Sequence, residues 1–186
     1  ALARGVGAAC TCALAVAAVS RLRPSAAAVP PAPGGLPHFA VVPVPGDGNC
    51  LFYSVAQGEA LAAGRQPLAG ESMRARGAAL RRLAVEELRR RREEVEWALE
   101  VEFDRYVDQM SRSGTWGGEI ELLMLSHRLG CPIEVYLRKQ MWQRIQSYGE
   151  EYASQPALYV LYHDGMGHYE ALWKQGGSAG SATSKL

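Results

Sequence analysis

The spacing of hydrophobic residues changes several times along this chain. Short runs rich in apolar, β-branched and aromatic residues predict strands at residues 39–42, 133–137, 145–148, 158–162 and 168–173. Between the first and second runs, apolar residues recur at intervals of three, four or seven, which predicts helices. The pattern therefore indicates an α+β fold with a small central β-sheet flanked by helices.

The longest helical pattern covers residues 71–110. Its apolar positions form one stripe, made of Met73, Leu80, Leu83, Ala84, Leu88, Val95, Leu99, Phe103 and Tyr106. The opposite side is strongly charged, and pairs four residues apart such as Arg89–Glu93 and Arg90–Glu94 are expected there. We interpret that side as a solvated helix face. A second helix is predicted at residues 119–129, and Gly130 is expected to end it.

The two ends of the chain differ in composition from the region between them. Residues 1–37 are rich in alanine and proline and contain no acidic residue, which is typical of a targeting segment or a disordered leader. Residues 175–186 form a Gly/Ser-rich tail that ends in Ser184-Lys185-Leu186, a match to the peroxisomal import signal. The chain is therefore predicted to hold one domain at residues 38–174, between a leader and a flexible tail.

Composition and charge exclude several classes of protein. A formal net charge of +1 gives no general attraction to nucleic acid. The apolar run at residues 5–19 is shorter than the ~20 residues that span a bilayer, so no stable membrane span is expected. The four cysteines, Cys10, Cys12, Cys50 and Cys131, form no disulfide framework and no paired metal spacing. We expect no metal and a reducing compartment: the cytoplasm, with the peroxisome or an organelle as alternatives.

Cys50 is the first candidate for chemistry. Asp47, Gly48 and Asn49 break any preceding regular structure, and the apolar residues that follow predict a helix whose first turn holds Cys50. The unpaired N–H groups and the positive dipole end at a helix start favour a thiolate and can receive an oxyanion. The alternative is an ordinary core cysteine, because free cysteines are among the most often buried residues.

His168 is the candidate base for that thiol. Gly165 and Gly167 predict a turn between two strands, so His168 opens the second strand. Side chains alternate along a strand, so Glu170 faces the same side and can accept the Nδ1–H of His168, leaving Nε2 for the sulfur. Asp47 is a second acidic candidate, with capping of the helix or shaping of the turn as its alternative roles. The residues alone do not choose between the two acids.

Three motifs in this order resemble the ovarian-tumour (OTU) family of cysteine deubiquitinases. Residues 47–52 read D-G-N-C-L-F, residues 115–122 read T-W-G-G-E-I-E-L and are followed by I-E-V-Y at 133–136, and residues 168–169 read H-Y. Each motif is weak alone, but their order and spacing together are specific. The resemblance spans roughly residues 38–173.

The resemblance implies a papain-like OTU fold and a thiol peptidase that cleaves after the C-terminal glycine of ubiquitin through a Cys-thioester intermediate. Carried over by motif, Cys50 is the nucleophile, His168 the general base and Asp47 the acid of the cysteine motif. Many relatives place Asn or Asp two residues after the histidine, where this chain has Glu170.

The implied partner is ubiquitin or polyubiquitin, and no cofactor is expected. Backbone N–H groups from Gly48 and Asn49 to the cysteine are expected to stabilise the oxyanion, and Trp116 is expected either beside the active-site cleft or in ordinary core packing. The charged helical region before the Trp-Gly-Gly motif is an alternative contact surface for ubiquitin. Two other functions stay open, a catalytically silent ubiquitin-binding module and a thiol hydrolase for another ubiquitin-like modifier.

Overall fold

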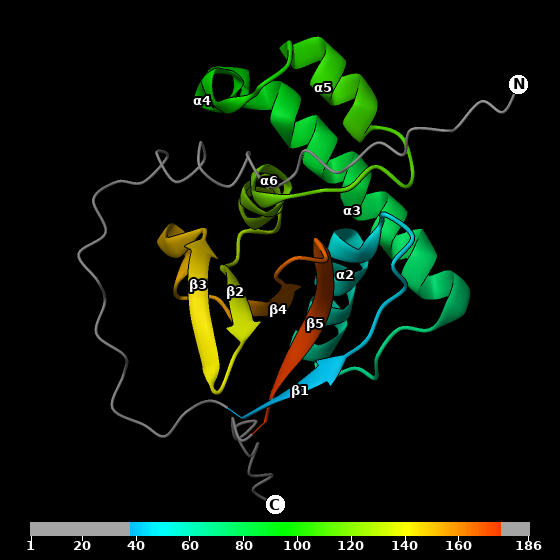
Figure 1. The fold of residues 1–186 in the computed structure, drawn as a ribbon, viewed down its shortest axis with the longest axis vertical. Coiled ribbons are helices and arrows are strands. Elements are labelled where there is room, and N and C mark those ends of the chain that lie inside the picture. The colour runs from blue at the N-terminus through cyan, green and yellow to red at the C-terminus, as the bar shows by residue number, and fades with distance from the viewer. Residues whose placement is uncertain (1–37, 176–186) are drawn as a thin grey trace, which may run out of the picture.

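The computed structural model describes residues 38–175, which form a mixed sheet with helices (Figure 1). The predicted leader and the import signal at the C-terminus lie outside the described residues, so the localisation drawn from them stays a prediction. None of the described helices is long and apolar enough to cross a membrane.

Five strands form one sheet, and the predicted α+β class is confirmed. The strands are β1 (His38–Val42), β2 (Ile133–Arg138), β3 (Trp142–Tyr148), β4 (Leu158–His163) and β5 (His168–Gln175). Their order across the sheet is β1-β5-β4-β2-β3. Only the β2–β4 pair is parallel, and the other neighbours are antiparallel. All five predicted strands are present, with ends that extend a little further than the sequence pattern.

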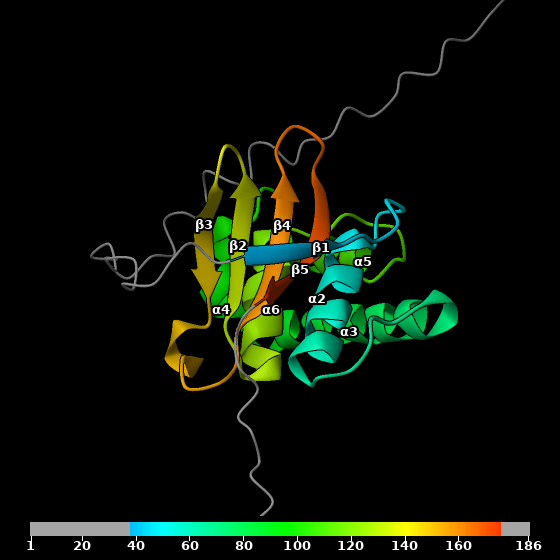
Figure 2. The ribbon, with the colours of Figure 1, turned by 90° about the horizontal axis from the view of Figure 1, so that it is seen from below.

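Helices pack on one face of the sheet in two layers. Helix α2 (Cys50–Ala62) contacts β4 and β5, and α6 (Glu119–Leu129) contacts β2 and β3. Helix α3 (Gly70–Arg90) lies across both of these helices, on the side away from the sheet (Figure 2). The main hydrophobic core fills the space between these layers. Helix α6 ends where it was predicted to end, at Gly130, whose φ of 63° is left-handed.

The opposite face of the sheet carries a small cluster of its own. Alternation along the strands sends Val135 and Val160 into the main core, and their neighbours Tyr136 and Leu161 to the other side. There the ring of Phe39 packs against Tyr136, with a centroid separation of 4.8 Å. This cluster stabilises the sheet from the face opposite the helices.

The prediction of one continuous helical stripe at residues 71–110 is wrong in one respect, because the helix ends at Arg91. Arg91 has φ −112° and ψ 30°, which ends α3 and rotates the next residues out of its register. Three short elements follow: α4 (Arg92–Val95), the 3-10 helix η1 (Glu96–Ala98) and α5 (Phe103–Met110). The ion pairs shift accordingly. Arg91 pairs with Glu87 and Glu94, in place of the predicted Arg89–Glu93 and Arg90–Glu94 pairs.

Candidate active site

Cys50 lies at the start of α2, where the sequence pattern placed it. The side chain is buried, and the backbone N–H groups of Cys50 and Leu51 point toward its sulfur. A third N–H group, from Tyr169 on β5, also interacts with the sulfur. The packing of α2 on β5 therefore brings the candidate nucleophile to the residue that follows His168.

Burial raises the pKa of the Cys50 thiol, and the negative charge of Asp47 adds to the rise. The N–H groups of Tyr169, Leu51 and Cys50 lower the pKa, as expected for a helix N-terminus, but they do not offset the burial. The resting thiol is therefore held in its protonated form near neutral pH. Chemistry at this sulfur requires a base to take the proton.

His168 opens β5 as predicted, and its ring lies against the loop that leads to Cys50. A Cβ atom built on Gly46 would stand 3.7 Å from Nδ1 and 3.8 Å from Cε1 of His168. The cysteine loop and the histidine strand thus meet at two points, Gly46 with His168 and Cys50 with Tyr169. The two distant motifs of the sequence form one site.

Glu170 has a different partner from the one expected. Its Oε2 lies 2.7 Å from Nε2 of His163, on the neighbouring strand β4. Among the residues that the structure describes, no hydrogen bond joins Glu170 to His168. The side chain of glutamate is long enough to cross from β5 to β4, where it meets His163. The sequence suggested His163 only as a metal-binding companion of His168, not as a partner of Glu170.

Asp47 shapes the turn before Cys50, one of the alternative roles considered for it. Its Oδ1 accepts hydrogen bonds from the backbone N–H of Asn49 at 3.0 Å and from the side-chain amide of Asn49 at 3.2 Å. Its Oδ2 accepts from the hydroxyl of Tyr53 at 3.2 Å. The N–H of Asn49, an expected oxyanion donor, is thereby bound to Asp47.

Gly48 is the closest point of the cysteine loop to the loop before the Trp-Gly-Gly motif. Its φ is +83°, and a Cβ atom at this position would stand 2.0 Å from the carbonyl oxygen of Gly114. Both the backbone conformation and the space demand glycine. The absence of a side chain at Gly48 therefore allows the turn to contact the backbone of Gly114 directly.

Arg81 of α3 joins these two loops and was missed by the sequence reasoning. The residue is only 4% exposed. Its guanidinium donates to Asn49 Oδ1 at 2.8 Å and to the carbonyl oxygens of Thr115 at 2.7 Å, Met110 at 3.1 Å and Gly48 at 3.2 Å. A signal was present, because position 81 follows Leu80 on the apolar side of the helical pattern, where a charge is unusual.

The guanidinium of Arg81 also lies over the ring of Phe52, 4.2 Å from its centroid. Burial lowers the pKa of Arg81, and the nearby Glu121 carboxylate opposes that change. Arg81 therefore ties the Cys50 turn to the segment that follows α5 and to the first turn of α2. We refer to this set of contacts as the Arg81 clamp.

Glu121, the acidic residue of the Trp-Gly-Gly motif, has a structural role. It is fully buried, and burial raises the pKa of its carboxyl group. The hydroxyl of Tyr106 and the backbone N–H of Gly118 each donate to it at 2.7 Å. The carboxyl group thus fastens the Trp-Gly-Gly segment between α5 and α6.

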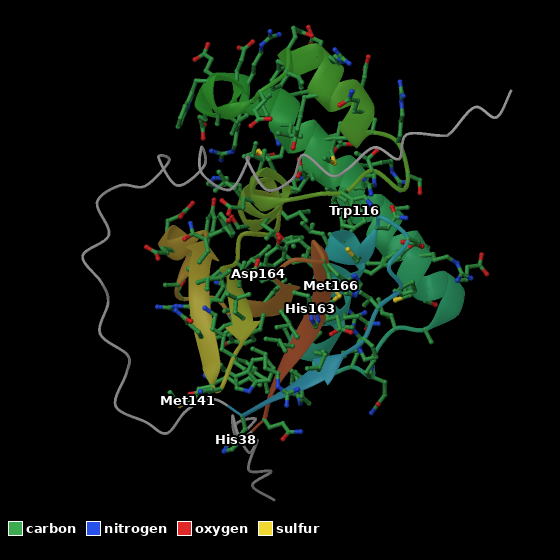
Figure 3. All side chains as sticks on the ribbon, viewed as in Figure 1. His38, Trp116, Met141, His163, Asp164 and Met166 are labelled. Atoms are coloured by element: carbon green, nitrogen blue, oxygen red, sulfur yellow. The ribbon has the colours of Figure 1, made fainter. Side chains whose placement is uncertain are left out.

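Trp116 lines a cleft beside the site, so the alternative of ordinary core packing is wrong. It is 43% exposed, and a Cβ atom on Gly167 would stand 2.7 Å from its ring. The cleft has a volume of about 430 Å³ and a largely apolar wall that includes Leu99, Ile145 and Tyr169. Figure 3 labels Trp116 with Met166 and His163 of the β4–β5 turn region.

The described residues contain no group of three His, Cys, Asp or Glu side chains placed to hold a metal ion. Cys131, the other described cysteine, packs against the main core, and burial raises its pKa to about 11. It follows the C-terminal end of α6 rather than the start of a helix. Cys50 is therefore the cysteine whose surroundings suit nucleophilic chemistry.

Comparison with protein families gives a match over residues 45–170, more than half of the chain, to the model described as OTU-like cysteine protease. Ovarian tumor domain-containing deubiquitinating enzyme 4 of Arabidopsis thaliana is 40% identical over 151 residues, which cover 80% of this chain and 47% of the relative. Ovarian tumor domain-containing deubiquitinating enzyme 3, also of Arabidopsis thaliana, is 30% identical over 169 residues, which cover 76% of this chain and 71% of the relative.

Solved structures agree with the family match. The Hazara virus OTU bound to ubiquitin is 28% identical with a TM-score of 0.55, covering 74% of this chain and 82% of that one. The OTUD1 OTU domain is 20% identical with a TM-score of 0.57, covering 73% of this chain and 86% of that one, and supports the fold. The chain spans about half the length, or less, of most of the curated relatives that it matches.

Proposed function

The chain belongs to the OTU-like cysteine protease family, and on this premise we propose that it is a deubiquitinase that hydrolyses the isopeptide bond after the C-terminal glycine of ubiquitin. One observation carries the proposal: the sulfur of Cys50 lies at a helix N-terminus and against the backbone of Tyr169, the residue next to His168. The names of the relatives and the ubiquitin complex of the Hazara virus OTU support the choice of substrate.

In the first step, His168 takes the proton of the Cys50 thiol, and the sulfur attacks the scissile carbonyl carbon. A base is needed here because burial raises the pKa of this thiol. The new C–S bond moves an electron pair onto the carbonyl oxygen. The N–H groups of Cys50 and Leu51, which already point toward the sulfur, are the proposed donors to this oxyanion.

The tetrahedral intermediate then collapses to a thioester. The C–N bond breaks, and the lysine amine leaves with the proton held by His168. Water enters, gives one proton to His168 and attacks the thioester carbonyl, which releases the ubiquitin carboxylic acid and the Cys50 thiolate. The acid loses its proton to solvent and becomes the carboxylate. That thiolate recovers the proton from His168, so the cycle consumes one water and needs no cofactor.

The apolar cleft beside Trp116 is the proposed binding site for the C-terminal tail of ubiquitin. It opens between the Trp-Gly-Gly segment and β3 and reaches Gly167 and Tyr169 next to His168. The exposed ring of Trp116 offers an apolar wall for the side chains of a bound peptide. Truncating that ring is expected to weaken binding of ubiquitin more than it slows the chemical step.

The experiment that tests the proposal is cleavage of a panel of diubiquitins of defined linkage. We expect the wild-type protein to cleave at least one linkage, and Cys50→Ala to lose at least about 1000-fold in rate. Cys131→Ala is the matched control, and it is expected to keep the activity because Cys131 lies in core packing. A folded protein that cleaves no conjugate, or a Cys50→Ala variant that stays active, would overturn the proposal.

A further inference from the structure

The β4–β5 hairpin places two imidazoles within reach of one carboxylate. His163 lies directly opposite His168 in the strand register, and their ring centroids are 5.7 Å apart. Glu170 lies two residues after His168 on the same face of β5 and is the diagonal neighbour of His163 across the strand pair. Its carboxylate is bound to His163, with Oε2 2.7 Å from Nε2.

The pair is partly buried, and we infer that a change of side-chain rotamer is enough to alter it. The His163 side chain is 28% exposed and that of Glu170 is 17% exposed. The backbone of both residues is held in the β4–β5 ladder, so the carboxylate can turn from one imidazole to the other while the sheet stays unchanged. Figure 3 labels His163 beside Met166 of the same hairpin, whose backbone N–H donates to the carbonyl oxygen of His163 at 3.2 Å.

We propose that His163 is a positioning residue that holds the Glu170 carboxylate away from His168. The inference rests on the proposed function, in which His168 is the general base. A carboxylate bound to the Nδ1–H of a catalytic histidine fixes its tautomer and stabilises its charged form. While Glu170 is bound to His163, His168 lacks this support, and the two histidines compete for a single acid.

Removing His163 therefore frees Glu170 for His168. In His163→Leu the carboxylate loses its present partner, and we expect it to turn to the imidazole of His168, two residues away on the same face of its own strand. A carboxylate partner favours the imidazolium, so the pH midpoint of the His168 titration is expected to rise. Cys50 of α2, Asp47 of the preceding loop and Asp164 of the β4–β5 turn are the same in every variant.

The test is a proton NMR titration of the imidazole resonances, which is practical because the chain has only four histidines. We expect the His168 midpoint to be at least 0.5 pH units, roughly a threefold change in proton affinity, higher in His163→Leu than in wild type. This rise is expected to vanish in His163→Leu/Glu170→Gln. His38→Leu, at the exposed start of β1, is the matched control and is expected to leave the midpoint unchanged.

An unchanged or lower His168 midpoint in His163→Leu would overturn the inference, and so would an equal rise in the double variant. Kinetics with a fluorogenic ubiquitin substrate give a second readout, with kcat expected to rise about threefold or more and KM unchanged. The titration uses no substrate. A protein that shows the midpoint rise but cleaves no ubiquitin conjugate therefore contradicts the proposed function alone, whereas an active protein without the rise contradicts only the role of His163.

Discussion

Replacing Arg81 by methionine removes the Arg81 clamp while keeping an apolar side chain of similar length over Phe52. The guanidinium donates to three backbone carbonyl oxygens and to Asn49 Oδ1, at distances between 2.7 and 3.2 Å. In Arg81→Met these acceptors lose a charged donor in a place that water barely reaches. The Cys50 turn and the segment around Thr115 then lose the side chain that joins them.

The expected loss is large for a single substitution. A hydrogen bond with a charged donor contributes about 1.5–3 kcal/mol, and the desolvation of the arginine offsets part of the sum of four. Leaving a buried carbonyl or amide oxygen without its donor typically costs about 1–3 kcal/mol, and Arg81, only 4% exposed, serves four such acceptors. We therefore expect the free energy of unfolding to fall by about 3–5 kcal/mol.

Urea unfolding followed by circular dichroism measures this loss, with Arg82→Met as the matched control. Arg82 is the next residue of α3 and is exposed, so its replacement is expected to cost less than about 0.5 kcal/mol. In the absence of urea, where the variant is still folded, Arg81→Met is also expected to lower kcat for a ubiquitin substrate. The reason is that Arg81 no longer holds the loop before Cys50 against the segment around Thr115. Equal unfolding free energies for the two variants would refute the clamp.

Three further outcomes follow from the same geometry. Gly48→Ala is expected to lose about 2 kcal/mol or more of unfolding free energy relative to Gly64→Ala. Both glycines have positive φ, but only at position 48 would the added Cβ atom stand 2.0 Å from a backbone oxygen, and equal losses would contradict this. Burial raises the pKa of Cys50, so its alkylation by iodoacetamide is expected to have a pH midpoint above that of a free cysteine peptide. The reaction is followed in a variant whose other three cysteines, Cys10, Cys12 and Cys131, are replaced by alanine, and a lower midpoint would show that burial does not dominate. Trp116→Ala is expected to raise KM for a ubiquitin substrate about tenfold with little change in kcat. Trp97→Ala, outside the cleft, is expected to change neither constant. A lower kcat at constant KM would show that Trp116 does not contribute to substrate binding.

The strands and two helices of the site were predictable because their signals are local. The Asp-Gly-Asn turn marks the start of α2 at Cys50, and the turn glycines place His168 at the head of β5. The break at Arg91 was not predictable, since the residues around it are good helix formers and the apolar stripe continues past it. Packing of the later short helices onto α3, rather than helix propensity, decides where the long helical pattern ends.

The partners of the acidic residues were beyond the reach of the sequence pattern for a different reason. The choice of Glu170 between His168 and His163 depends on the register of β4 against β5, which pairs His163 with His168. The role of Arg81 depends on the meeting of two loops more than 60 residues apart, as the hydrogen bond between Gly114 and Asn49 shows. Contacts of this kind follow from the tertiary arrangement and not from spacing along the chain.

The most direct test of the whole account is a reaction with ubiquitin that carries an electrophile in place of its C-terminal glycine carboxylate. Peptide mass spectrometry of the product locates the modified residue. The account predicts a single adduct on Cys50 of the wild-type protein, and none in Cys50→Ala. A folded wild-type protein that forms no adduct, or an adduct found on Cys131, would contradict it.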